Sequence, residues 1–245
     1  LPLVLKDISF KVNGGEKIGI CGRTGAGKSS IMTALYRISE LDHGAIYIDG
    51  VDVSSLGLES LRSRLSIIPQ DPVLFAGSIR KNLDPFGEND DDKLWDALRR
   101  SHLIDLEELA EVKSQVKLSE TTIHKFHLDQ IVEDEGANFS LGERQLIAFA
   151  RALVRNTKIL VLDEATSLVD YETDNKIQTT IAEEFRHCTI LCIAHRLKTI
   201  IKYDRIMTLE RGRLVEFDTP IDLFNREDGI FRQMCDKSDI KIADF

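Results

Sequence analysis

Residues 22–29 have the types and the spacing needed to bind a polyphosphate. They read GRTGAGKS and fit the pattern G-x-x-x-x-G-K-[ST] of a phosphate-binding loop. Glycines let backbone N–H groups turn inward around a di- or triphosphate, and the N-terminus of a following helix adds partial positive charge. Lys28 can reach the β- and γ-phosphates, and the Ser29 hydroxyl can ligate Mg²⁺. The residues expected to line the nucleotide are Gly22, Arg23, Thr24, Gly25, Ala26, Gly27, Lys28, Ser29 and Ser30.

The flanks of this segment provide the strand and the helix that such a loop requires. Residues 17–21 form an apolar run typical of a buried strand. Ile31, Leu35 and Ile38 then recur on one face of a predicted helix. The bare pattern arises by chance in roughly one chain of this length in a hundred, so the matching flanks make an accidental match a poor explanation.

A pair of acidic residues follows a second apolar strand. Residues 159–162 read ILVL and are followed by Asp163 and Glu164. Asp163 can hold Mg²⁺, usually through water, and Glu164 can orient or deprotonate an attacking water. Acidic residues often end strands, so the pair is a weak signal by itself. Together with a phosphate loop it indicates phosphate hydrolysis.

Two further polar residues stand at predicted strand ends. His195 follows the apolar run 189–194, and Gln70 follows the strand 65–68 and Pro69. Ligand sites of α/β proteins gather at the carboxyl ends of parallel strands. We therefore expect His195 to contact the γ-phosphate and the Gln70 amide to reach the Mg²⁺ shell. The alternative for His195 is a purely structural role.

The composition is that of a globular protein with a large core. The 245 residues are 42% hydrophobic and 30% charged, with a net charge of −9. An acidic chain argues against sequence-independent binding of nucleic acid, which needs a basic surface. No apolar run approaches the roughly 20 residues of a membrane-spanning helix. The sequence opens at Leu1 inside an apolar run, so we expect a domain of a longer protein. Buried free thiols are predicted at Cys21, Cys188, Cys192 and Cys235.

The first third of the chain has the patterns of short strands. Residues 3–21 predict two strands joined at 13–15, and residues 45–53 predict a hairpin around Asp49 and Gly50. A further strand is expected at 65–68. The early part is therefore predicted to be rich in antiparallel strands.

Helical patterns follow from about residue 78 to residue 150. Asp90, Asp91 and Asp92 are expected to begin a helix, with Trp95 as a packing residue. Residues 107–127 predict a loop-rich insertion, in which His124 and His127 have no third candidate metal ligand. Buried parallel strands are expected at 159–162 and 189–194 with helices between them. A last hairpin is predicted across 206–217, and a helix begins after it at residues 218–220.

Residues 138–145 read NFSLGERQ, a small-residue loop that opens a helix shortly before the Asp163 strand. Six motifs therefore follow one another: the phosphate loop, the glutamine at 70, this loop, the Asp-Glu strand end, the loop 167–170 and the histidine at 195. Their order resembles the ATP-binding cassette family over essentially the whole chain.

The resemblance implies an α/β fold: a RecA-like P-loop NTPase core with an antiparallel β subdomain and a helical subdomain inserted at about 72–150. It implies that residues 1–245 are a single nucleotide-binding domain, cut from a longer membrane transporter and lying at the cytoplasmic face of a membrane. The implied activity is a Mg²⁺-dependent ATPase that powers export. The implied partners are a second nucleotide-binding domain in the same polypeptide and the transmembrane domains. The alternative is a regulatory cassette that closes on ATP with little turnover.

The family also assigns roles to the candidate residues. Glu164, His195 and Gln70 correspond to catalytic positions, and Ser29, Gln70 and Asp163 to the Mg²⁺ site. Asp170 belongs to the loop that follows the acidic pair. The signature loop, which contacts the ATP of the partner domain, corresponds to Ser140, Leu141, Gly142 and Glu143.

Three segments narrow the resemblance within the family. Residues 22–30, residues 82–86 (NLDPF) and residues 194–200 (AHRLKTI) resemble the second cassette of C-type, multidrug-resistance-associated exporters. The acidic stretch before Phe139 is most similar to fungal oligomycin-resistance transporters.

The sequence departs from the family pattern in several places. The family stacks adenine on an aromatic residue upstream of the phosphate loop; Phe10 is too close to the loop, so we expect that residue before Leu1. Leu141 and Glu143 replace the common Gly and Gln of the signature loop. A carboxylate near a γ-phosphate is unfavourable. We therefore expect the site on this phosphate loop to hydrolyse ATP and the site completed by this signature loop to hold it. The alternative is that Glu143 points away and both sites work normally.

Overall fold

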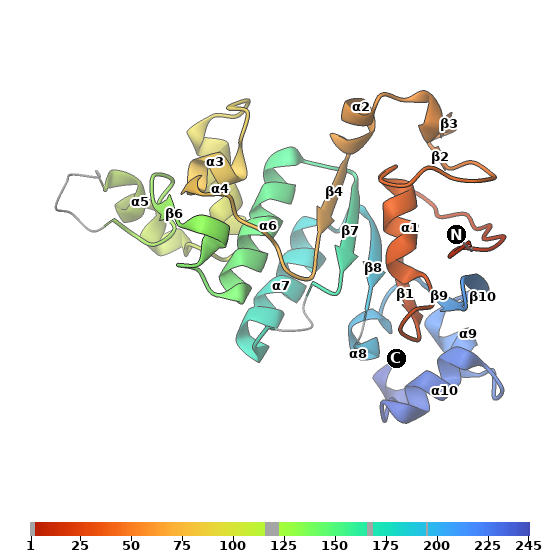
Figure 1. Cartoon of the computed structure of the whole chain (residues 1–245). Coiled ribbons are helices and arrows are strands. Elements are labelled where there is room, and N and C mark those ends of the chain that lie inside the picture. The colour runs from red at the N-terminus through yellow and green to blue at the C-terminus, as the bar shows by residue number, and fades with distance from the viewer. Residues whose placement is uncertain (1–2, 116–122, 166–168, 195) are drawn as a thin grey trace. The chain divides into compact units, whose positions relative to one another are not determined.

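The computed structural model describes residues 3–115, 123–165, 169–194 and 196–245 (Figure 1). The chain forms two compact units. The first comprises Leu1–Ile67, Thr157–Ser167 and Cys188–Phe245, and the second comprises Ile68–Asn156 and Leu168–His187.

The first unit is built on a mainly parallel sheet. Among the described residues the strand order is β10-β9-β1-β8-β7-β4. The pairs β9–β1, β1–β8 and β8–β7 are parallel, whereas β10 runs antiparallel to β9. The predicted α/β class is confirmed, and so are the predicted strands at 65–68, 159–162 and 189–194 and the last hairpin. The strands are β1 (Lys17–Gly22), β4 (Leu65–Ile68), β7 (Ile159–Asp163), β8 (Thr189–Ile193), β9 (Arg205–Glu210) and β10 (Arg213–Asp218).

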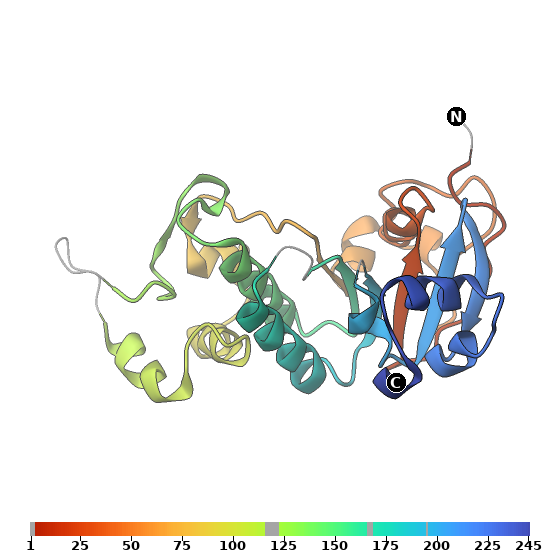
Figure 2. The ribbon, with the colours of Figure 1, turned by 90° about the horizontal axis from the view of Figure 1, so that it is seen from below.

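Short helices and one small hairpin complete this unit. The hairpin pairs β2 (Tyr47–Ile48) with β3 (Val51–Asp52), as predicted, and turns at Asp49 and Gly50, whose φ values of 50° and 79° suit a type I′ turn. Figure 2 shows the carboxy-terminal helices beside the β9–β10 hairpin. The helices are α1 (Lys28–Leu35), α2 (Leu58–Arg62), α8 (Leu197–Ile200), α9 (Pro220–Phe224) and α10 (Ile230–Lys237), with 3-10 turns at Val53–Ser55 and Ile242–Asp244.

The core of this unit consists of the apolar strand residues and the inner face of α1. Ile18, Ile20 and Ile193 are at most 1% exposed, and Ile31 of α1 joins the same cluster. All four cysteines are free and buried, as predicted. Burial raises the pKa of the Cys21 thiol to about 12, which keeps it protonated and unreactive.

Two sequence-based predictions for this unit are wrong. No strand forms in residues 3–16, because this segment finds little to pair with: the Lys6 N–H donates to the Gly212 carbonyl at 2.7 Å, and Leu3 and Val4 remain exposed. Ile38 does not belong to the buried face of α1. The helix ends at Leu35, and Ile38 is 67% exposed.

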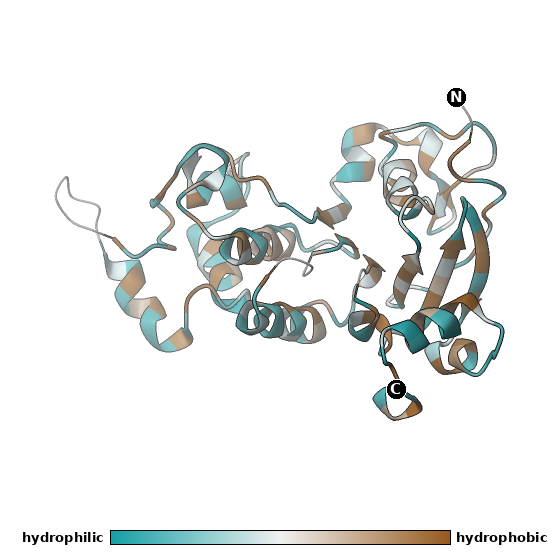
Figure 3. Cartoon of the chain, turned by 60° about the horizontal axis from the view of Figure 1, so that its bottom comes forward, coloured by the Kyte–Doolittle hydropathy of each residue, from teal (hydrophilic) through white to brown (hydrophobic). Residues whose placement is uncertain are grey.

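The second unit consists mainly of helices. Helix α6 contacts α3, α4 and α7, and in Figure 3 apolar and polar residues alternate along these helices. Their apolar faces meet in a core that includes Leu94, Leu98, Ile147 and Phe149. The elements are β5 (Gly77–Ser78), α3 (Ile79–Leu83), α4 (Asp91–Arg100), α5 (Leu106–Ser114), β6 (Ile131–Val132), a 3-10 turn at Asp134–Gly136, α6 (Leu141–Arg155) and α7 (Tyr171–Glu184).

The acidic run begins a helix, as predicted. The Asp90 carboxylate caps α4 by accepting a hydrogen bond from the Lys93 N–H at 2.9 Å, and Trp95 is buried. The predicted loop over 107–127 is wrong in its first part, which forms α5. Within α5 only Val112 is buried, so the helical periodicity in the sequence is weak.

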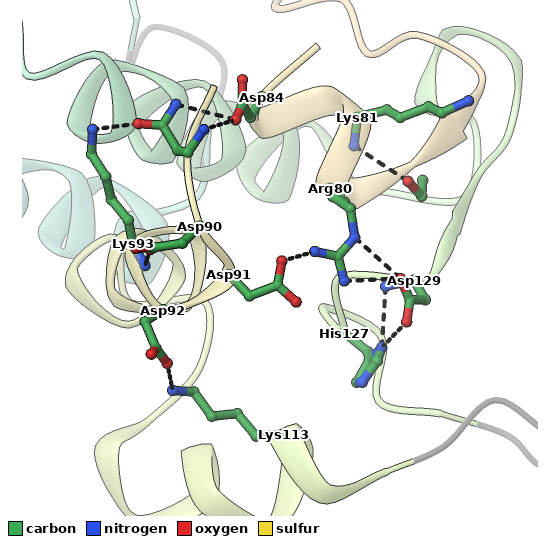
Figure 4. Close-up of polar contacts among 12 residues, drawn as sticks. Arg80, Lys81, Asp84, Asp90, Asp91, Asp92, Lys93, Lys113, His127 and Asp129 are labelled. Atoms are coloured by element: carbon green, nitrogen blue, oxygen red, sulfur yellow. Dashed lines mark hydrogen bonds and ion pairs between the residues drawn. The ribbon is translucent and has the colours of Figure 1, made fainter. Parts of the chain in front are cut away.

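A polar cluster joins α3, α4 and the segment before β6 (Figure 4). The Arg80 guanidinium forms ion pairs with Asp91 and Asp129. His127 is buried; its Nδ1 accepts the Asp129 N–H at 3.1 Å, and its ring meets Trp95 edge to face at 5.2 Å. Burial lowers the pKa of His127, with the attraction of Asp129 opposing the shift. The folded unit therefore favours the neutral form of this histidine.

This environment predicts a pH-dependent stability. Because the pKa of His127 is lower in the folded chain than in the unfolded chain, protonation favours unfolding. The stabilisation is present above the unfolded pKa of about 6.5 and is lost as the pH falls below it. We expect the free energy of unfolding of wild type to fall more steeply from pH 7 to pH 5 than that of His127→Gln, by at most about 1.4 kcal/mol per pH unit. Urea titrations across this range measure both slopes, and equal slopes would contradict the prediction.

Candidate functional site

The phosphate loop lies between β1 and α1, as the sequence predicts. Gly22 has a φ of 147°, and a Cβ there would lie 2.3 Å from the Leu209 carbonyl oxygen, so this position requires glycine. Gly27 is the N-cap of α1, and no side chain caps that helix. The Gly212 N–H donates to the Ala26 carbonyl at 3.0 Å and fixes the loop to the β9–β10 turn. The uncapped N–H groups of the first turn are therefore available to an anion.

Lys28 is the buried cation of this loop. The residue is 8% exposed, and its Nζ donates to the carbonyl oxygens of Gly22 at 3.0 Å and Arg23 at 3.3 Å. The ammonium group is held against the loop's own backbone. Phosphate oxygens carry more negative charge than these carbonyls, so they can compete for the same donors.

The acidic pair lies at the same edge of the sheet as the phosphate loop. Ile193 of β8 is the register partner of Ile20 in β1 and of Asp163 in β7. All three strands are parallel, so their carboxyl ends lie side by side. The Glu164 N–H donates to the Ile193 carbonyl at 2.9 Å. The same unit thus brings the phosphate loop and both carboxylates to one edge.

The backbone of Glu164 is strained. Its φ of 54° lies in the left-handed region, which costs an L-residue with a side chain about 1 kcal/mol or more. The hydrogen bond to Ile193 helps to hold this conformation. Non-glycine residues with such backbone angles cluster at functional sites. Glu164 shares this conformation with eight other described non-glycine residues, so the backbone angle is consistent with a functional role but does not by itself assign one.

Two of the three predicted Mg²⁺ ligands belong to the first unit, and the third belongs to the second unit. Ser29 is exposed in the first turn of α1, and Asp163 is half-buried at the end of β7, both in the first unit. Hydroxyl and carboxylate oxygens are the hard donors that Mg²⁺ prefers, together with several waters, so this pair fits the ion. Gln70 belongs to the second unit, and its role at the ion stays a prediction. His195 lies outside the described residues.

The signature loop begins helix α6. Ser140 is the N-cap: its Oγ accepts the Glu143 N–H at 3.2 Å, while the Glu143 carboxylate accepts the Ser140 N–H at 2.7 Å. This is a capping box, and it turns the Glu143 side chain back over the first turn. The Lys125 Nζ also lies 2.7 Å from each Glu143 carboxylate oxygen. Both groups that Glu143 binds belong to its own unit.

The start of α7 lies against the start of the signature helix α6. The Asp170 carboxylate caps α7 by accepting the Thr173 N–H at 3.0 Å and its hydroxyl at 2.8 Å. These hydrogen bonds lower the pKa of Asp170. Gly142 faces the same threonine: a Cβ on Gly142 would lie 2.7 Å from Thr173 Cγ2 and 2.9 Å from its Oγ1. Helices α6 and α7 therefore approach closely where both begin.

Two features of the signature loop were missed in the sequence. The spacing S-x-x-E from Ser140 to Glu143 is that of a capping box. It could have predicted that the Glu143 side chain turns back toward the Ser140 N–H. Lys125 lies 18 residues before its partner, in a segment with weak periodicity, and no local pattern reveals it. Within the described residues, no three His, Cys, Asp or Glu side chains form a possible metal site, and His124 Nδ1 instead accepts the Phe126 N–H at 3.2 Å.

A phosphate loop after β1, with two carboxylates at the end of β7 on the same sheet edge, defines a P-loop nucleotide-binding protein. The sequence pattern of the ABC transporter family matches residues 5–167. The chain belongs to the ABC transporter family.

Relatives and a solved structure agree with this assignment. The chain is 65% identical to an oligomycin-resistance ATP-dependent permease of Saccharomyces cerevisiae, over 100% of the chain and 17% of the permease. It is 58% identical to an ABC-type transporter of Emericella nidulans, over 100% of the chain and 18% of that protein. It is 50% identical to human ATP-binding cassette sub-family C member 3, over 96% of the chain and 14% of that protein.

A bacterial Atm1-family ABC exporter with ATP bound superimposes with a TM-score of 0.81 at 33% identity, over 97% of this chain and 40% of the exporter chain. The predicted resemblance to C-type exporters and to oligomycin-resistance transporters is confirmed. This chain spans less than a fifth of the three relatives. Within the described residues no helix is long and apolar enough to cross a membrane.

The geometry of Lys28 predicts its effect on nucleotide binding. Lys28→Ala removes the cation that the loop positions, and a hydrogen bond to a charged group is worth about 1.5–3 kcal/mol. We expect the Kd for ATP to rise roughly ten- to a hundredfold. Equilibrium titration with a fluorescent ATP analogue measures the change. Lys202→Ala, at an exposed position of the same unit, is the control. An unchanged Kd in Lys28→Ala would remove the loop from the site.

The contact between α6 and α7 predicts a coupled pair of substitutions. Gly142→Ala places a methyl group against Thr173, and overpacking of this kind costs about 1–3 kcal/mol of unfolding free energy. Thr173→Ala makes room, so the double variant should be more stable than the sum of the two single losses by at least about 0.5 kcal/mol. Urea unfolding of the four proteins measures the coupling.

Gly14→Ala serves as the control for this pair, because a Cβ at Gly14 meets no atom within 4 Å. If the losses of Gly142→Ala and Thr173→Ala simply add, the contact does not hold the two helices together.

Proposed function

We propose that this chain binds and hydrolyses ATP as one of two cassettes of a membrane exporter. The observation that carries the proposal is the shared register at Ile193, which brings the end of β1 and the end of β7 to one sheet edge. The phosphate loop and the acidic pair then act on one nucleotide. Family membership supports ATP as that nucleotide.

The proposed chemistry assigns one task to each group. The loop N–H groups and Lys28 hold the β- and γ-phosphates, with Lys28 exchanging its backbone carbonyl partners for phosphate oxygens. Mg²⁺, when bound, neutralises charge on the phosphate oxygens, and Ser29 and Asp163 are its proposed ligands, with Gln70 as a third. Glu164 orients the attacking water and accepts its proton. We assign the γ-phosphate contact to His195.

The proposed exporter needs a second cassette. In this scheme the ATP held by each phosphate loop is covered by the signature loop of the partner cassette, and hydrolysis reopens the pair. The opening and closing move transmembrane domains, so this chain works at the cytoplasmic face of a membrane. The names of two similar proteins, an oligomycin-resistance ATP-dependent permease and an ABC exporter, support transport out of the cell as the task.

Glu164 favours turnover over a regulatory cassette that closes without hydrolysis. Such a cassette needs the phosphate loop but no water-activating carboxylate. Here the carboxylate is present, and its backbone is held in a strained conformation beside β8.

The proposal predicts the outcome of Glu164→Gln. The amide keeps the shape of the side chain and loses the charge that activates water, so Mg²⁺-dependent turnover should fall at least about a hundredfold. The affinity for ATP should stay within about threefold of wild type, because the phosphate contacts are unchanged. Single-turnover hydrolysis and nucleotide titration on the full-length protein measure the two quantities.

Glu59→Gln removes an exposed carboxylate from the same unit and is the matched control. Wild-type single-turnover rates in Glu164→Gln would exclude Glu164 as the water activator and would favour the regulatory alternative.

A further inference from the structure

The Lys125–Glu143 pair places a compensating charge at the signature loop. The Lys125 Nζ lies 2.7 Å from both carboxylate oxygens of Glu143. One of these oxygens also accepts the Ser140 N–H at 2.7 Å. The Glu143 side chain is 24% exposed and that of Lys125 46%. The carboxylate is thus bound on two sides, while the lysine keeps contact with solvent.

Aromatic packing fixes the segment that carries the lysine. The Lys125 Nζ lies 5.5 Å from the centroid of the Phe139 ring, and the neighbouring Phe126 ring lies 6.0 Å from the same ring. Phe139 is 5% exposed and directly precedes Ser140. The backbone at Phe126 is held in turn by His124 Nδ1. Residues 124–126 therefore pack against the residue that precedes the signature loop.

The negative charge of Glu143 has opposite effects on its own helix and on an anion that approaches the start of that helix. A carboxylate in the first turn stabilises a helix, because it faces the positive end of the helix dipole. The same carboxylate repels an anion that approaches that helix end. In the proposed function, the partner's triphosphate makes this approach to the N-terminus of α6. Glu143 can cap the helix and still admit a phosphate more readily if a nearby cation balances its charge.

We propose that Lys125 is a positioning residue of the signature loop, which neutralises Glu143 and keeps the loop receptive to the nucleotide triphosphate held by the second cassette. This inference rests on the proposed function. It assigns a task to the segment around residue 125, and it explains how a signature loop with glutamate in place of glutamine can still meet a phosphate. It also removes the electrostatic reason for the expected difference between the two ATP sites, because the charge of Glu143 is balanced within its own unit.

The test measures how readily the two cassettes close on ATP. In the full-length protein, the Glu164→Gln background stops turnover, and the ATP concentration for half-maximal occlusion of radiolabelled ATP is measured. Lys125→Met keeps the aliphatic chain beside Phe139 and removes the charge. We expect this concentration to rise about two- to fivefold, the range that one exposed pair allows. Lys125→Glu should raise it about tenfold, because it adds a second carboxylate.

Three further measurements separate charge from packing. Lys125→Arg should stay within about twofold of the background, since it keeps the cation. Glu143→Gln added to Lys125→Met should return the concentration to that of Glu143→Gln alone, because no charge then needs a partner. The shift caused by Lys125→Met should shrink as ionic strength rises from 0.05 to 0.5 M, as screening requires, with the Debye length falling to about 4 Å.

Lys113 provides the matched control. It forms an ion pair with Asp92 at 3.0 Å in the same unit, and neither residue forms a hydrogen bond or ion pair with Glu143 (Figure 4). Lys113→Met should leave the occlusion concentration unchanged. Equal concentrations in Lys125→Met, Lys125→Glu and the background would overturn the inference, as would a shift that Glu143→Gln does not relieve. Absence of any occluded ATP in the Glu164→Gln background would instead overturn the proposed function, and the inference with it.

Discussion

The candidate site depends on the way β8 joins its two neighbours. Ile193 is paired with Ile20 on one side and with Asp163 on the other, and its carbonyl also accepts the Glu164 N–H. Residues that lie more than 140 positions apart in the sequence are thereby fixed at one edge. A shift of one residue in either pairing would turn the strand's side chains to the opposite face and move the acidic pair away from the loop.

Much of this unit could be predicted because its signals are local. The phosphate loop has a fixed spacing, and the apolar runs at β1, β7 and β8 stand out from the helices between them. Asp49-Gly50 identifies a two-residue hairpin turn for the same reason: both residues tolerate the left-handed backbone that the turn demands. The acidic pair needed one further step, the expectation that parallel strands end at the same edge.

The errors arose where a distant partner decides the structure. Residues 3–16 look strand-like, yet an extended segment becomes a strand only where another strand offers its N–H and C=O groups. Helix α5 buries little besides Val112, so its pattern is faint. Lys125 meets Glu143 only after the chain has folded, and a lone lysine carries no sign of its partner. Of the expected site, the structure brings the loop and the acidic pair to one sheet edge, while the roles of Gln70 and His195 stay predictions from strand position and resemblance.

The Lys125–Glu143 pair also bears on how this loop can change during evolution. If the proposal holds, a glutamate at position 143 favours a cation at position 125, whereas a glutamine at position 143 does not need one. A lineage that starts with glutamine can therefore gain the lysine first at little cost and the glutamate afterwards, while the reverse order passes through a loop with an unbalanced charge. The two positions are expected to covary among related cassettes, and the lysine should be the older of the two changes.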